Sequence, residues 1–357
     1  MRPEAQQRPA RPVMLDVARR AGVSLKTVSR VINEEPNVRP AVRNRVRAAI
    51  RALGYRPNSA ARTLAARSSH VIGVVALGSA LYGPASQMFG VERAAWQAGY
   101  SVVVSSLGET TTEELVRAVG ELVDHGVDGI VIAAPVHVAP VAADELLQGI
   151  PAVSLDRFPD EMGLPAVLSD QRTGSRDATE HLLRLGHETV WHVAGPFSWH
   201  PTQERMTGWR EALESAGIPV PEPVEGDWSA GTGYAIGREL AARPEVTAVF
   251  AANDHTAMGL MRAFFDAGRR IPDDVSIVGF DDVPEAEHLL IPLSTVRQDF
   301  EAATRRAVGE LLSMLRADGR PAVPDLTFVP VELKIRASSG PPGGIRTQAP
   351  MTMADQE

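Results

Sequence analysis

Between residues 70 and 336 the chain alternates short apolar runs with longer segments of helical periodicity, and it does so in two successive blocks. The apolar runs are residues 71–77, 101–107, 129–134 and 152–156 in the first block, and 190–195, 248–254 and 275–282 in the second. Strands that alternate with helices form parallel sheets covered by helices on both faces. Two such blocks predict an α/β core with two lobes.

Polar side chains recur where these predicted strands end. Ligands of open α/β sheets bind at the carboxyl ends of the strands, and in a two-lobed core we expect those ends to face each other across a cleft. The candidate ligand-binding residues are Asp156, Arg205, Trp228, Asn253, Asp281, Gln298 and Phe300. Carboxylate, amide and guanidinium groups pair with hydroxyls, and an indole covers an apolar ring face. This combination favours a sugar ligand.

Each candidate also has a purely structural interpretation. An Asp or Asn at a strand end is often the cap of the following helix. Arg205 is able to pair with a surface carboxylate, and Trp228 is able to fill a core. The prediction of a site therefore depends on all seven residues meeting in one cleft.

Charge is divided unevenly along the chain. Residues 1–67 contain 15 Lys and Arg against 4 Asp and Glu, a net charge of +11. The remaining residues contain 21 basic and 40 acidic side chains, a net charge of −19. A short basic segment ahead of an acidic core indicates a polyanionic partner for that segment alone.

The basic segment has the periodicity of a small helical domain. Residues 14–21 form a short amphipathic helix, and Ser24 is a candidate cap for a second helix over 25–33. A third helix is predicted over 40–53, ending at Gly54. Two short helices joined by a glycine-containing turn are the helix-turn-helix pattern, whose second helix enters the DNA major groove by its N-terminal end. Leu25 and Lys26 occupy that end.

Residues 58–67 (NSAARTLAAR) predict a further short helix between the two parts, with Leu64 as its only large apolar side chain. Leu64 has two interpretations: a linker contact with a neighbour, or a wedge between base pairs in the minor groove. The full set of candidate DNA-binding residues is Ser24, Leu25, Lys26, Thr27, Ser29, Arg30, Asn33, Tyr55, Asn58, Ala61 and Leu64.

The segments DVARRAGVSLKTVSRVIN and GYRPNSAARTLA resemble the head and hinge of the lactose/galactose (LacI/GalR) repressor family. The resemblance implies a hinge that is helical only on operator DNA, with Leu64 intercalated at the operator centre. It departs from the family where Thr or Ser usually caps the first and third helices, because Val13 and Arg39 stand there. Each lost cap costs about 1 kcal/mol, although Arg39 is placed to gain a phosphate contact.

The core is similar to periplasmic sugar-binding proteins and, within the family, to its lactose-repressor branch. The matching segments are PASQM, ERMTGW, EGDWSA, ANDHTAMG, GFDD and RQDF. Residue by residue, the resemblance makes Asp156, Arg205, Trp228, Asn253, Asp281 and Phe300 ligand contacts and Gln298 a lobe-crossing residue. Ala133 and His255 stand where that branch has Asn and Gln. A galactoside is therefore the favoured effector, with another sugar or a purine co-repressor as alternatives.

Several other kinds of protein are disfavoured. The chain has no cysteine, its N-terminus has no apolar segment of a secretory signal, and no stretch has the roughly 20 apolar residues of a membrane span. The glycines of 231–237 lack the spacing and context of a dinucleotide loop. Neighbouring strand residues such as Asp281 and Asp282 point to opposite faces, which does not suit a glycosidase. We expect no enzyme activity, metal or cofactor, and a cytoplasmic location.

The predicted organisation is a disordered arm over 1–12, a helix-turn-helix domain over 13–57, a hinge over 58–69 and a ligand-binding core over 70–336. Lobe 1 takes about 70–168 and 299–328, and lobe 2 takes about 169–298 and 329–336. Residues 337–357 are rich in Pro, Gly and polar side chains, so we expect a disordered tail. The tail has no heptads, which favours a homodimer on a pseudo-palindromic operator. A stand-alone sugar-binding protein is the less favoured alternative.

Overall fold

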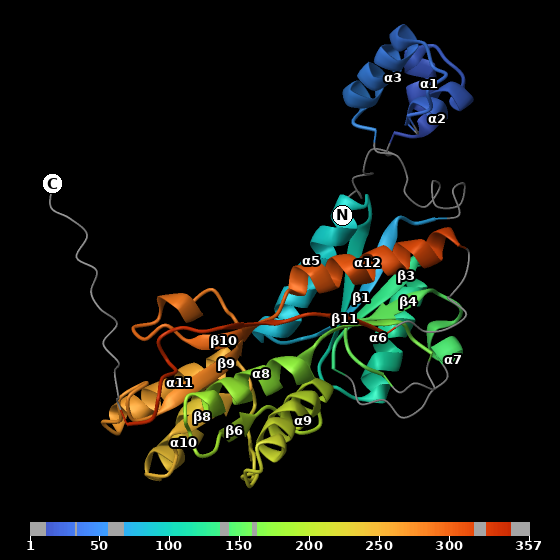
Figure 1. Ribbon diagram of the computed structural model, residues 1–357. Helices are drawn as coiled ribbons and strands as arrows, with labels where there is room; N and C mark the ends of the chain where they lie inside the picture. The colour runs from blue at the N-terminus through green and yellow to red at the C-terminus, as the bar shows by residue number, and fades with distance from the viewer. Residues whose placement is uncertain are drawn as a thin grey trace, which may run out of the picture. The chain divides into compact units, whose positions relative to one another are not determined.

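The computed structural model describes residues 12–32, 34–55, 68–135, 143–158, 163–317 and 326–343. The chain divides into two compact units, Met1–Ser69 and His70–Glu357 (Figure 1).

The first unit is a bundle of three helices: α1 (Met14–Ala21), α2 (Leu25–Ile32) and α3 (Pro40–Leu53). Val17, Val28 and Val46 are fully buried at its centre. Gly22 and Gly54 end α1 and α3 with φ of 63° and 61°, a left-handed conformation that glycine adopts without steric cost. The three predicted helices and both glycine stops are confirmed.

The predicted cap of the second helix is also confirmed. The Ser24 hydroxyl accepts a hydrogen bond of 3.2 Å from the Thr27 backbone N–H and lies 2.9 Å from the Thr27 hydroxyl. At the start of α1, Val13 offers no side-chain acceptor, but the Asp16 carboxylate accepts the Val13 backbone N–H at 2.9 Å. Part of the cost expected from the missing cap is therefore offset by Asp16.

Replacing Ser24 with alanine leaves the Thr27 N–H without its side-chain acceptor. We expect the variant to lower the free energy of unfolding of the helical unit by about 1 kcal/mol. Urea unfolding followed by circular dichroism measures this change. Ser24→Asp restores a capping oxygen and should recover most of the loss; equal destabilisation by both variants would contradict the capping role.

The first lobe of the core is a six-stranded parallel sheet in the order β11-β5-β4-β3-β1-β2. Its strands are β1 (Val71–Leu77), β2 (Ser101–Leu107), β3 (Gly129–Ala133), β4 (Ala152–Ser154), β5 (Ala166–Ser169) and β11 (Leu326–Val329). One face packs against α5 (Tyr82–Gln97) and α12 (Phe300–Arg316), which lie side by side in Figure 1. The other face packs against α6 (Thr112–Asp124) and α7 (Ala143–Leu147).

The second lobe has a sheet in the order β12-β10-β9-β8-β6-β7. Its strands are β6 (Trp191–Ala194), β7 (Val224–Glu225), β8 (Ala248–Ala251), β9 (Ser276–Asp281), β10 (Ser294–Arg297) and β12 (Glu332–Lys334). Helices α8 (Gln171–Arg184) and α9 (His200–Ser215) cover one face. Helices α10 (Ala230–Ala241) and α11 (Asp254–Asp266) cover the other, and a short 3₁₀ turn (Ala286–His288) follows β9. The prediction of all-parallel sheets needs one correction, because β12 runs antiparallel to β10.

The chain passes between the lobes three times. The crossings lie between β5 and α8, between β10 and α12, and between β11 and β12. They place 170–171, 298–299 and 330–331 at the junction. The contacts of side chains at these positions therefore depend on how the two lobes are arranged.

The expectation of disorder from residue 337 is wrong for 337–343. Ser338 is fully buried, and its hydroxyl donates to the Ile277 carbonyl at 2.6 Å while accepting the Ser294 N–H at 2.7 Å. The Gly340 carbonyl lies 2.9 Å from the Ser276 hydroxyl. Composition alone predicted disorder for these residues, but buried hydroxyls form hydrogen bonds with the backbone groups of this segment and hold it in place. The rest of the predicted tail and the arm over 1–11 lie outside the described residues.

Candidate functional site

The first turn of α2 forms an exposed surface on the helical unit. Leu25 is 46% exposed although it is a large apolar residue, and Lys26 and Ser24 are exposed beside it. Thr27, Ser29 and Arg30 are half-buried, and Arg30 forms an ion pair with Glu35 at 3.4 Å. An exposed leucine next to a lysine at a helix N-terminus is suited to base edges and phosphates in a major groove.

Of the other predicted DNA contacts, the structure describes Tyr55. Tyr55 is only 7% exposed and its ring packs in the core of the helical unit, so its contact with DNA stays a prediction. Its ring closes a core that has few large side chains. Asn33, Asn58, Ala61 and Leu64 lie outside the described residues.

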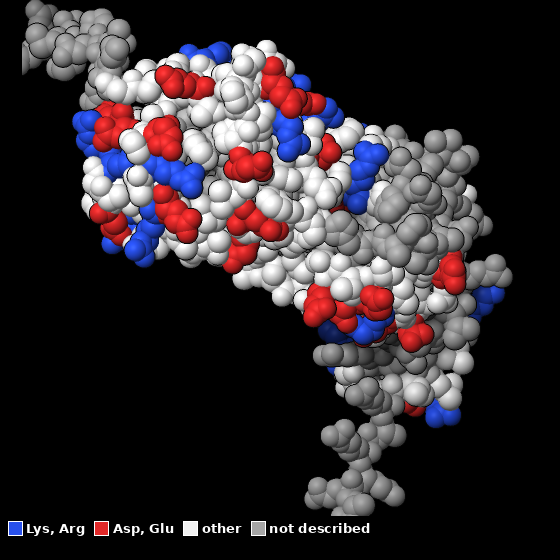
Figure 2. Space-filling model, turned by 90° about the horizontal axis from the view of Figure 1, so that it is seen from below, with Lys and Arg blue, Asp and Glu red and all other residues white. Residues whose placement is uncertain are grey.

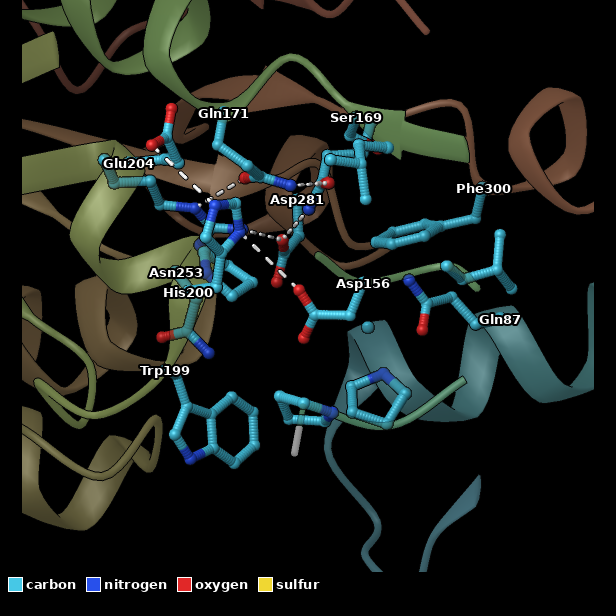
Figure 3. A pocket seen from close by; sticks show the side chains of 18 of the residues that line it. Gln87, Asp156, Ser169, Gln171, Trp199, His200, Glu204, Asn253, Asp281 and Phe300 are labelled. Carbon is cyan, nitrogen blue, oxygen red and sulfur yellow. Dashed lines mark hydrogen bonds and ion pairs between the residues drawn. The ribbon is translucent and has the colours of Figure 1, made fainter. Parts of the chain in front are cut away.

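All seven predicted ligand-binding residues line one pocket between the lobes (Figure 3). Lobe 1 and its junction contribute Asp156 and Phe300, and lobe 2 contributes the other five. The complete lining is Leu81, Tyr82, Gly83, Pro84, Gln87, Pro135, Leu155, Asp156, Leu168, Ser169, Asp170, Gln171, Trp199, His200, Pro201, Glu204, Arg205, Trp228, Asn253, Asp281, Gln298, Phe300 and Phe328.

A hydrogen-bonded network forms the base of the pocket. Arg205 donates from Nε to Gln171 at 2.8 Å and from Nη1 to the Ala252 carbonyl, and its Nη2 lies 3.7 Å from the Asp281 carboxylate. Gln298 donates to Asp281 at 2.7 Å and accepts from Gln171 at 2.8 Å. Gln171 and Gln298 stand on two of the lobe crossings, so the network joins the binding groups to the junction.

Burial strongly affects the charges of this network. Burial lowers the pKa of Arg205 to about 10, while the nearby Asp281 and Asp254 oppose the shift. Burial raises the pKa of Asp281, and Arg205 and the Gln298 hydrogen bond oppose it. Asp281 has φ of 111°, which is uncommon outside glycine. A buried charge pair with free lone pairs in a cleft is characteristic of a binding site.

Asn253 and Trp228 are positioned together. The Asn253 side chain accepts the Thr256 N–H at 2.9 Å as the cap of α11, and it donates to the Trp228 carbonyl at 3.0 Å. The capping interpretation of Asn253 is therefore true, and the same side chain fixes the tryptophan. Gly195 is required beneath the Trp228 ring, because a Cβ there would lie 2.2 Å from it.

Asp281 and its neighbour Asp282 point to different partners. Asp281 faces the pocket, whereas Asp282 accepts a 2.7 Å hydrogen bond from Arg336 and does not line the pocket. The two carboxylates therefore do not form the facing pair that a glycosidase places around the bond it cleaves.

Several pocket residues were not predicted from the sequence. Tyr82 lies edge-on to Phe300 at 5.9 Å between ring centroids, and Trp199 lies 5.5 Å from Trp228. Gln171 and the pair His200 and Glu204 were also missed. Gln171 follows β5, a strand that the sequence analysis did not predict. A search for aromatic residues just before helix starts would have found Trp199.

Asp254 lies behind the pocket, outside its lining. Burial raises its pKa to about 8, and the nearby Asp281 raises it too, while hydrogen bonds from Thr295 and Val283 lower it. An acid whose pKa is higher folded than unfolded contributes stability that is lost as pH rises from about 4 to about 8. Asp254 therefore contributes a decrease in the melting temperature of the core across this range, opposed by buried histidines such as His192, whose pKa burial lowers to about 4.

Asp254→Asn removes the titrating proton and keeps an acceptor for Val283, so the slope of melting temperature against pH should become more positive than in the wild type. Calorimetry from about pH 4.5 to about pH 8 measures the slope. Asp266→Asn, an exposed acid at the other end of α11 whose pKa is lowered by Arg262, is the matched control and should leave the slope unchanged. An equal slope in wild type and Asp254→Asn would contradict the assignment.

Two buried histidines have structural partners. His187 contacts Thr247, Ser276 and the Gly340 carbonyl at 3.0–3.1 Å, and His192 is stacked on Phe250. Residues 231–237 lie in helix α10 rather than in a loop. Within the described ranges, no group of His, Asp and Glu is arranged to hold a metal ion, and no helix is long and apolar enough to cross a membrane.

The surface of the core carries both signs of charge. On the face in Figure 2, acidic and basic side chains are interspersed, without a broad area of one sign. Ion pairs between helix neighbours, such as Arg262 with Asp266 at 2.9 Å, join them.

Comparison with known proteins gives consistent relatives. A model of the lacI family of bacterial regulatory proteins matches residues 13–58, and a periplasmic binding protein-like domain matches 179–339. The chain is 34% identical to the lactose operon repressor of Escherichia coli K12, covering 97% of this chain and 95% of that protein. Ribose operon repressors and a repressor named PurR from Vibrio parahaemolyticus also match.

Two solved structures are similar over most of the chain. The Lac repressor dimer bound to operator and the anti-inducer ONPF has a TM-score of 0.83 at 33% identity, covering 93% of this chain and all of that one. The complex of the regulator CelR with cellobiose has a TM-score of 0.66 at 33% identity, covering 92% and 100%. The chain therefore belongs to the lacI family of bacterial regulatory proteins, as a DNA-binding repressor with a sugar-binding core.

Proposed function

We propose that this repressor is a homodimer whose operator affinity is controlled by a small sugar held between the lobes, with a galactoside-like inducer favoured. The observation that supports this most is the make-up of the pocket. It brings the carboxylates of Asp156 and Asp281 and the guanidinium of Arg205 together with the rings of Trp228 and Phe300. Such a set pairs with hydroxyls of both hydrogen-bonding senses and covers an apolar ring face.

A sugar is favoured over a purine because the pocket is rich in charged acceptors. Asp156 and Asp281 are 8% and 6% exposed, and each retains a carboxylate oxygen that accepts no hydrogen bond from another described side chain. Several hydroxyls are able to donate to these oxygens at once. A purine has few N–H donors for the same positions.

The lobe crossings provide a route from ligand to DNA. Gln171 and Gln298 stand on two crossings and are joined to Arg205 and Asp281 by hydrogen bonds of 2.7–2.8 Å. A ligand that binds Arg205 and Asp281 biases the arrangement of these crossings, and with it the arrangement of the lobes. The ligand must bind the two arrangements with different affinity, because equal affinity shifts no equilibrium.

The test is release of DNA by a ligand. A labelled duplex enriched by this protein from a random library is titrated with the full chain in an anisotropy assay, with and without galactosides, other sugars and purines. We expect a galactoside to weaken binding at least about tenfold, an effect of about 1.4 kcal/mol. Stronger binding with a purine would replace the inducer by a co-repressor, and no effect of any sugar would contradict the proposal.

A further inference from the structure

We infer that the pocket holds two sugar rings, so that the effector is a disaccharide, and that Trp199, His200 and Glu204 form a second subsite for the outer ring. This inference rests on the sugar-binding function proposed above. It assigns the first subsite to the base around Arg205 and Asp281, and the second to the start of helix α9.

Aromatic rings stand at two separate parts of the pocket. Phe300, in contact with Tyr82, lies at one side of the view in Figure 3, and Trp199 lies at the other, with Asp156 between them. Trp199 is tilted 50° from the Trp228 ring, at 5.5 Å between centroids, so the two indoles form a corner rather than a stack. Two platforms at separate parts of the pocket, with polar groups between them, suit two rings.

Trp199 is held in place although its side chain is only half-buried. It is the cap residue of α9: its N–H donates to the Pro196 carbonyl at 3.0 Å, and its own carbonyl accepts the Gln203 N–H at 3.1 Å. The loop before it is fixed as well, because the Phe197 N–H donates to Glu225 at 2.6 Å. A ring positioned in advance loses little entropy when a ligand packs on it.

Polar groups of both lobes meet next to Trp199. His200 Nδ1 lies 3.6 Å from the carboxylate of Asp156 in lobe 1, and His200 Nε2 lies 3.8 Å from the carboxylate of Glu204 on the following turn. Both distances are longer than a direct hydrogen bond, so the three groups keep hydrogen-bonding capacity for sugar hydroxyls that pack beside them. Glu204 and His200 are 34% and 26% exposed in their side chains, which places this subsite toward the opening and the Arg205 subsite deeper.

The two subsites contribute differently to the binding of monosaccharides and disaccharides. A monosaccharide in the deep subsite contacts Arg205 and Asp281 and gains little from Trp199. A disaccharide places its second ring against Trp199 and its hydroxyls near His200 and Glu204. Removing the Trp199 ring therefore penalises disaccharides selectively.

The experiment is isothermal titration of the full-length protein and its Trp199→Ala variant. The ligands are the best-binding member of a panel of lactose, melibiose, cellobiose and maltose, and the methyl glycosides of its two component sugars. Phe197→Ala is the matched control, because Phe197 is an aromatic residue of the same loop that does not line the pocket. Thermal unfolding of each variant establishes that it is folded.

We expect Trp199→Ala to weaken disaccharide binding about tenfold, the effect of one aromatic contact, and monosaccharide binding less than about twofold. Phe197→Ala should change neither. Equal losses for both ligand sizes, no loss for the disaccharide, or wild-type binding of the monosaccharides as tight as that of the disaccharide would overturn the second subsite while leaving the sugar function intact. Absence of binding by every sugar would overturn both.

Discussion

Raising the salt concentration from roughly 50 mM to roughly 200 mM lowers the affinity of this protein for operator DNA by about 10³- to 10⁵-fold. The reason is the net charge of +11 on residues 1–67, in a chain whose overall net charge is −8. If a dimer neutralises about 8 phosphates, the logarithm of affinity falls with a slope of about −7 against the logarithm of salt. Anisotropy titrations of a labelled duplex at several salt concentrations measure the slope.

Lys26→Ala is the informative variant for this measurement. Lys26 is exposed in the first turn of α2, and the loss of a single phosphate contact should reduce the slope by about 1 per protomer. A wild-type slope shallower than about −2 would show that the basic unit does not bind the phosphate backbone.

Changing Asp281 to asparagine should weaken sugar binding at least about 100-fold and remove the response of DNA binding to sugar. The substitution keeps an oxygen for the Gln298 donor at 2.7 Å but removes the charge that faces Arg205 and the ligand hydroxyls. Hydrogen bonds to a buried charge contribute about 1.5–3 kcal/mol each, and a sugar is expected to make more than one. Asparagine also tolerates φ of 111° better than most residues. Calorimetry gives the affinity, and anisotropy gives the response.

The neighbouring residue provides the control. Asp282→Asn makes the same chemical change one position along, where the side chain accepts from Arg336 at 2.7 Å outside the pocket. It should retain sugar binding and the response. Loss of DNA binding without sugar in a folded Asp281→Asn protein would contradict its assignment to the ligand pocket.

The strands were predictable where short apolar runs are bounded by turn residues. Residues 71–77 and 101–107 form β1 and β2 with the predicted bounds, because the Val-rich runs VIGVVAL and SVVVSSL are each followed by a glycine, Gly78 and Gly108. Strands β5 and β11 have only four residues each and do not stand out from their surroundings. They are defined by pairing with each other, which is a long-range contact that local periodicity does not reveal.

The pocket was predictable to the extent that it follows from sheet geometry. Asp156 in lobe 1 and Asn253 and Asp281 in lobe 2 lie at the carboxyl ends of strands, and each sheet brings such positions to the edge that faces the cleft. Trp199 and His200 reach the pocket from the start of α9 and Gln171 from the start of α8, and no strand pattern points to them. Tyr55 was predicted to contact DNA because it is an aromatic residue in a basic segment. Its ring packs in the core of the small helical unit.

The most direct test of the account is a thermal-shift screen of the full chain against galactosides, other mono- and disaccharides, and purines. A ligand present at about 100 times its Kd adds about 2.7 kcal/mol of stability, which is a shift of several degrees for lobes of this size. The account predicts such a shift with a sugar, and its loss in Asp281→Asn but not in Asp282→Asn. A shift with purines alone would contradict the sugar pocket.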